Sequence, residues 1–172
     1  MKREIGWLAT TLLVAGLIVG SSRADEPLEQ EDRTAGTLDV APISAPYAQW
    51  LVEATMSTHA ALRGMEIVAR VDGVLRTIAA SDAGEIGERS GADDDEIIRT
   101  GMAAVESPES PDEPYEVTSP LLDAGGNAIG VLSLDIAADD LDENQVVTLA
   151  RNVRAEMEER IASEEALFEA IP

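Results

Sequence analysis

The sequence predicts an α+β fold in which one antiparallel sheet is flanked by an N-terminal and a C-terminal helix. Two stretches alternate apolar and polar residues around a glycine-containing turn, residues 65–80 and residues 115–136. Apolar residues at helical spacing precede the first hairpin and follow the second. Because the connections are short, all four strands can join one sheet, and a short fifth strand near residues 102–105 can extend it.

The N-terminal residues 1–24 have the features of an export signal. Two basic residues precede an uncharged run over residues 5–20, and small residues stand before Asp25. A helix of that length spans about 24 Å, which is less than the roughly 30 Å hydrocarbon core, so cleavage is favoured over an uncleaved anchor. We therefore expect a periplasmic or secreted mature chain, attached to a membrane only if the signal is uncleaved.

The chain is strongly acidic, with 34 Asp and Glu against 12 Lys and Arg and a net charge of −22. Such a charge repels phosphate backbones and anionic membrane surfaces, so nucleic acid is not expected as a partner. The acids are spread along the chain, which is typical of a soluble surface. The high acid content, with no Lys after residue 24, suggests a salt-tolerant source. The sequence contains no cysteine, which excludes disulfides and a lipid-modified cysteine.

A linker, a helix and a hairpin are expected next. Residues 25–43 are acidic, contain two prolines and lack an apolar period, which predicts a disordered linker. Ser44 is then expected to cap a helix that Gly64 ends. Asp72-Gly73 joins the following two strands, because both residues accept the positive φ of a two-residue hairpin turn.

The middle of the chain predicts a short helix and an exposed loop. The acids at 93–96 crowd the start of a helix that Gly101 ends, where negative charge complements the helix dipole. They lack the alternating spacing of a calcium loop, so no metal is expected there. Residues 106–114 hold three prolines and four acids, which predicts an exposed and mobile loop.

The last helix is expected to begin at Asp142, with Gln145 completing a capping box. Its apolar stripe extends to Phe168, and we expect a folded core over residues 44–162 inside a single domain of residues 44–172 with a C-terminal helix. Leu167 and Phe168, beyond that core, are expected to form an exposed apolar end. The stripe consists of Val146, Leu149, Ala150, Val153, Met157, Ile161 and Phe168.

This order of elements resembles the single Cache domain, an extracytoplasmic sensor family related to PAS domains. The segments that carry the resemblance are "VARVDGVLRTIAAS", "EIGERSGADDDEIIRTG" and "YEVTSPLLDAGGNAIGVLSLDI", between a long entry helix and a closing helix, from about Ala45 to Ala162. The resemblance implies a PAS/Cache-like sheet flanked by long N- and C-terminal helices, with a small-ligand pocket on the other face. Such domains usually lie between two membrane spans of a receptor, whereas this sequence suggests a free-standing binder.

Five polar residues on or beside the strands are candidate ligand-binding groups. An arginine can hold a carboxylate bidentately, and Asp135 can accept hydrogen bonds from an amine. Because Asp135 and Ser133 alternate with the more apolar side of their strand, they are expected on the pocket side. The alternatives are a strand-end acid that reaches solvent and arginines that pair with surface acids. The candidates are Arg70, Arg76, Tyr115, Ser133 and Asp135.

Catalysis is not expected, and neither is a cofactor. The only histidine, His59, has no companion at metal-ligand spacing, so a hydrogen-bonded surface histidine is favoured. No nucleophile elbow, phosphate loop or haem-attachment motif is present.

Three functions remain open at this point. The first is an exported sensory or accessory module that binds a small polar molecule such as an amino acid or organic acid. The second is a structural or interaction protein that docks a membrane receptor or forms a homodimer through its C-terminal helix. The third is a weak hydrolase.

Overall fold

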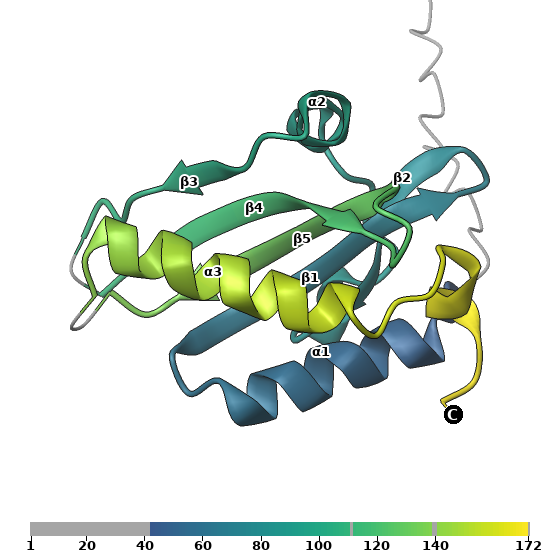
Figure 1. Ribbon diagram of the computed structural model, residues 1–172, viewed down its shortest axis with the longest axis horizontal. Helices are drawn as coiled ribbons and strands as arrows, with labels where there is room; N and C mark the ends of the chain where they lie inside the picture. Colours follow the sequence, from purple (N-terminus) through teal and green to yellow (C-terminus); the bar gives the residue numbers. More distant parts are fainter. Residues whose placement is uncertain (1–41, 111, 139–140, 172) are drawn as a thin grey trace, which may run out of the picture. The chain divides into compact units, whose positions relative to one another are not determined.

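The computed structural model describes residues 42–110, 112–138 and 141–171, so the expectations for residues 1–41 lie outside the described residues. These residues form a five-stranded antiparallel sheet with the strand order β2-β1-β5-β4-β3, and the predicted α+β class is confirmed (Figure 1). The strands are β1 (Leu62–Val71), β2 (Val74–Ala80), β3 (Ala104–Glu106), β4 (Tyr115–Leu122) and β5 (Ala128–Ile136). The helices are α1 (Pro46–Thr58), α2 (Ala92–Thr100) and α3 (Glu143–Glu158), with short 3-10 helices η1 (Ala83–Glu85) and η2 (Glu165–Phe168).

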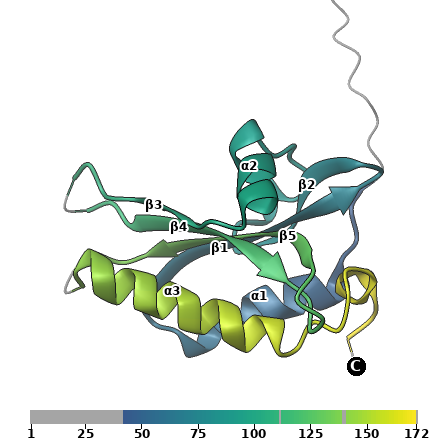
Figure 2. The same cartoon turned by 45° about the horizontal axis from the view of Figure 1, so that its top comes forward.

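The helices lie on both faces of the sheet. Helices α1 and α3, of 13 and 16 residues, cover one face, and α2 lies on the other (Figure 2). No helix in the described part of the chain is long and apolar enough to cross a bilayer.

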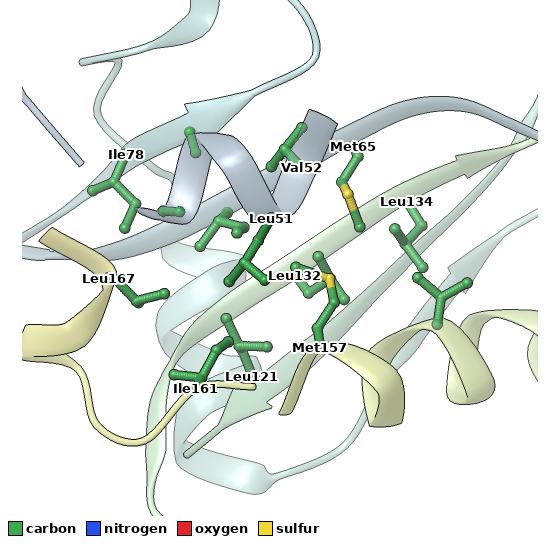
Figure 3. Packing of buried hydrophobic residues seen from close by; sticks show 14 of the residues in the cluster. Leu51, Val52, Met65, Ile78, Leu121, Leu132, Leu134, Met157, Ile161 and Leu167 are labelled. Carbon is green, nitrogen blue, oxygen red and sulfur yellow. The ribbon is translucent and has the colours of Figure 1, made fainter. Parts of the chain in front are cut away.

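The main core fills the space between the sheet and the two longer helices. Because successive strand residues point to opposite faces, Leu132, Leu134 and Ile136 all face this layer. Leu51 of α1 and Met157 of α3 pack against them (Figure 3). A smaller cluster lies under α2, on the other face of the sheet. It consists of Val68, Leu75, Ile97 and Val131.

The two predicted hairpins are present. Asp72 and Gly73 take φ values of 50° and 79°, as the predicted two-residue turn requires. In the second hairpin, Oδ1 of Asp123 accepts hydrogen bonds from the backbone nitrogens of Gly125 and Asn127 at 2.8 and 2.9 Å. As predicted, β2 ends at Ala80, β4 begins at Tyr115 and β5 ends at Ile136.

The first helix differs from its prediction at both ends. Its N-cap is Ala45, which makes no side-chain cap bond, so Ser44 is not the cap. The helix ends at Thr58, and Gly64 lies inside β1 instead of ending a helix. The apolar stripe runs on past the helix because the residues after Thr58 turn directly into the sheet.

The C-terminal region also differs from its prediction. The capping box of Asp142 and Gln145 is present, but α3 ends at Glu158. The chain then bends, and Leu167 of η2 is 0% exposed, so it belongs to the core and is not an exposed apolar end. Phe168 packs against the same core, and the backbone nitrogen of Tyr47 donates to the carbonyl of Glu169 at 3.2 Å.

Candidate functional site

Three carboxylates line up across neighbouring strands on the face opposite α1 and α3. Asp135 of β5 lies directly opposite Glu116 of β4, and Glu116 lies opposite Glu106 of β3. Glu66 of β1 lies on the next rung, opposite Ser133. Because neighbouring strands are about 4.8 Å apart, the register alone gathers these acids in one region of the sheet.

A cavity of about 350 Å³ lies over this region. Its walls come from β1, β4 and β5 together with the chain that leaves β2 and enters η1. The lining residues are Arg63, Gly64, Met65, Glu66, Ser81, Asp82, Glu85, Glu116, Ser133 and Asp135.

Hydroxyl groups hold part of this lining in place. The hydroxyl of Thr77 donates a short hydrogen bond to the carboxylate of Glu66. The hydroxyl oxygens of Thr118 and Ser133 are 3.3 Å apart on adjacent strands. The hydroxyl of Ser81 accepts a hydrogen bond from the backbone nitrogen of Met65 at 3.1 Å. These hydrogen bonds give the cavity a defined polar wall.

The electrostatics of the cavity are those of crowded, partly buried acids. Burial raises the pKa of Asp135, and it raises the pKa of Glu66 and Glu116 together with repulsion from neighbouring carboxylates. The pKa of Glu85 is raised by desolvation and by Asp82 and Asp135. Each shift means that the ionised form of the carboxyl group is disfavoured relative to an acid in water.

The acids are not arranged as a metal site. Within residues 42–110, 112–138 and 141–171, no three His, Asp or Glu side chains are placed to hold a metal ion together. His59, the lone histidine, lies elsewhere and has its Nε2 3.0 Å from Oε2 of Glu156.

The five candidate residues fall in different places. Ser133 and Asp135 both line the cavity. Arg70 pairs with Asp95 of α2 at 2.8 Å, with both side chains about half exposed or more. Arg76 donates to the carbonyl of Gly87 at 2.8 Å. Tyr115 packs against the main core on the helix-covered side. The structure thus brings two of the five together.

Sequence reasoning missed Glu66, Glu116 and Arg63, all of which line the cavity. The alternation along each strand could have placed two of them on the cavity side. Glu66 alternates with core residues of β1, and Glu116 alternates with core residues of β4. The missing information is the register that places Glu116 beside Asp135, which depends on tertiary pairing.

Comparisons with known proteins leave the family unassigned. No protein-family model matches the chain, and no curated protein matches it. Among solved structures, the GAF domain of a two-component sensor histidine kinase from Bacillus halodurans is 11% identical, with a TM-score of 0.48 over 65% of this chain and 91% of that one. A GAF sensor protein from Burkholderia vietnamiensis is 17% identical, with a TM-score of 0.46 over 69% of this chain and 76% of that one.

A third similar structure is the inducer-binding domain of a double mutant of the transcription factor PobR from Acinetobacter, in complex with 3-hydroxybenzoic acid. It is 13% identical, with a TM-score of 0.40 over 64% of this chain and 95% of that one. Membership of the Cache family stays a prediction. At these low identities, function has to be judged from the cavity itself.

Proposed function

We propose that this domain binds a small organic cation, an amine or the ammonium group of an amino acid, in the carboxylate-lined cavity. The observation that carries the proposal is the pairing of Asp135 with Glu116 on one rung of the sheet, in the wall of that cavity. Like charges directly opposite each other destabilise a sheet. A bound cation would remove this cost, so the site is favourable for positive charge.

The chemistry of the lining defines the ligand further. An ammonium group has three donors, and Asp135, Glu116 and Glu66 supply acceptors on three adjacent strands. Hydrogen bonds between ionised partners are about twice as strong as neutral ones. Among the described residues of the lining, Arg63 is the single basic one, and the carboxylates around it would repel a plain organic acid. An amino acid, which carries an ammonium group, is therefore favoured over an organic acid.

We assign the cavity to binding rather than to catalysis. Its lining contains serines and carboxylates but no histidine or cysteine, and the one histidine of the chain is paired with Glu156. A pocket with a few aimed polar groups is sufficient for a sensory or accessory module. Its downstream partner would be a membrane receptor or a second copy of the chain.

We also propose that the domain acts outside the cytoplasm, after cleavage before Asp25. This part of the proposal depends on the basic start and uncharged run within residues 1–24. Intact-mass measurement of the protein from the exported fraction should give a chain that starts at Asp25. A membrane-bound species that keeps Met1 would contradict it.

The binding proposal is tested by a thermal-shift screen at neutral pH with primary amines, amino acids and organic acids. Amines and amino acids should raise the melting temperature, and organic acids should not. Asp135→Asn and Glu116→Gln should each weaken binding at least about tenfold, because each removes an ionised acceptor. Glu169→Gln, which changes an exposed acid outside the cavity, should bind like the parent.

Two results would overturn the proposal. The first is the absence of any shift with cationic compounds. The second is an equal loss of binding in Glu169→Gln, which would show that net charge acts without a defined site.

A further inference from the structure

Gly64 is a glycine that its own backbone conformation does not require. Among the residues that the structure describes, the glycines with positive φ are Gly73, Gly87, Gly101 and Gly126, and Gly64 is not one of them. It lies inside β1, where glycine loses more conformational entropy on folding than other residues and gives no side chain to pack. Its presence in a strand therefore needs another physical reason.

The reason lies in its partner across the sheet. Gly64 pairs with Asp135 of β5, and a Cβ atom built on Gly64 would overlap Oδ2 of Asp135. The same Cβ would lie 3.0 Å from Cγ and 3.2 Å from Cβ of Asp135. The side chain of Asp135 therefore occupies the space in which a side chain of residue 64 would stand.

Gly130 shows what a purely structural glycine looks like in this sheet. A Cβ on Gly130 would overlap the backbone carbonyl oxygen of Val68, which cannot move without disturbing the pairing of β1 and β5. At Gly64 the nearest obstacle is the end of a flexible side chain, which can rotate away, and the 3.2 Å contact with Cβ of Asp135 requires a shift of only a few tenths of an ångström. Substitution of Gly64 should thus displace the carboxylate and leave the sheet intact.

The local register supports the same conclusion. The pairing of β1 with β5 shifts between Leu62 and Gly64, so two steps along β1 match one step along β5. An irregularity of this kind re-aims side chains next to a site. Here it lies at the wall of the cavity, which both Gly64 and Asp135 line.

We propose that Gly64 is a positioning residue of the binding site: its missing side chain lets the carboxylate of Asp135 lie over β1 at the wall of the cavity. This inference rests on the proposed binding function, because the orientation matters only if Asp135 contacts a ligand. It assigns a role to a glycine that sequence reasoning places at the end of a helix.

The decisive experiment needs no ligand. Carbon-13 NMR titration of the Asp135 carboxyl group is compared between the parent and Gly64→Ala. Burial raises the pKa of Asp135 in the parent, so displacement toward solvent should lower this pKa toward its ordinary value. An unchanged pKa of Asp135 in Gly64→Ala would overturn the inference.

Thermal unfolding supplies the structural control. Gly64→Ala should melt at the parent temperature or slightly above it, because alanine suits a strand better than glycine. Gly130→Ala should melt well below the parent, because its Cβ meets backbone atoms. A large destabilisation by Gly64→Ala would mean that the glycine serves the fold and not Asp135.

Calorimetry with ethylammonium tests whether Gly64 affects ligand binding through Asp135. Gly64→Ala should weaken ethylammonium binding at least about tenfold, and Gly64→Ala combined with Asp135→Ala should bind no worse than Asp135→Ala alone. Additive losses would contradict a role through Asp135. If the parent binds no amine, the proposed function fails, while the NMR titration still decides how Gly64 places Asp135.

Discussion

Glu116 of β4 lies directly opposite Asp135 of β5, so two carboxylates occupy one rung of the sheet beside a cavity. Burial raises the pKa of both groups, and the pKa of Glu116 is raised further by repulsion from Glu106 and Asp135. A sequence selected only for stability would avoid such a pair, because like charges opposite each other weaken a sheet. Local costs of this kind are expected at functional sites, where a ligand compensates for them.

Removal of one charge from this pair should stabilise the ligand-free protein. We expect Glu116→Gln to raise the free energy of unfolding at pH 7 by about 0.2–1 kcal/mol, the size of a cross-strand pair effect. Urea unfolding measures the change, with Glu169→Gln as the control that stays within about 0.5 kcal/mol of the parent. A loss of stability in Glu116→Gln would show that the carboxylate is already compensated.

Stability should also depend on pH through Glu66, Glu116 and Asp135. Each has a pKa raised in the folded state, so the folded protein binds more protons than the unfolded chain between the ordinary and the raised pKa. Their contribution to the free energy of unfolding is fully present below the ordinary pKa values of 4.5 for Glu and 3.8 for Asp. It is lost as the pH rises through the raised pKa values.

The melting temperature of the ligand-free protein should therefore rise as the pH is lowered from 7 toward 4.5, the ordinary pKa of Glu. Over the same window, binding of a cation should weaken, because protonation removes the charges that attract it. Glu66→Gln should reduce the change of melting temperature with pH. A melting temperature that falls steadily over this range would contradict the raised pKa values.

Much of the sheet could be predicted because its signals are local. Alternation of apolar residues and the dipeptide Asp72-Gly73 set the boundaries of a hairpin without reference to the rest of the chain. The capping box of Asp142 and Gln145 is equally local. Strand parity also placed Ser133 and Asp135 on the side opposite the longer helices.

Features that depend on tertiary contacts could not be predicted in this way. Gly64 follows an apolar stripe and so resembles a helix end, yet its role is set by Asp135 on another strand. The stripe after Glu158 continues at near-helical spacing although the chain bends, because Ile161 and Leu167 reach the same core from a turn. The pairing of Glu116 with Asp135 likewise depends on register between strands.

The capping box at the start of α3 gives a test of local helix stability. Asp142 accepts from the backbone nitrogen of Gln145 at 2.9 Å, and the side chain of Gln145 accepts from the backbone nitrogen of Asp142 at 2.9 Å. Asp142→Ala should lower the free energy of unfolding by about 0.5–2 kcal/mol. Chemical denaturation measures this, and Asn144→Ala, an exposed change in the same turn, should cost less than about 0.5 kcal/mol. Equal effects of the two changes would argue against the cap.

The final prediction concerns the C-terminal turn. Leu167 lies among the core side chains near Ile161 (Figure 3). Leu167 is 0% exposed, whereas Ile171, four residues later, is 53% exposed. Leu167→Ala should therefore lower the free energy of unfolding by about 2–5 kcal/mol, the cost of lost burial plus a cavity. Ile171→Ala removes the same kind of side chain from the surface and should change it by less than about 0.5 kcal/mol. Urea unfolding of both variants decides the matter, because equal small effects would mean that η2 contributes nothing to the core and that the folded domain ends with α3.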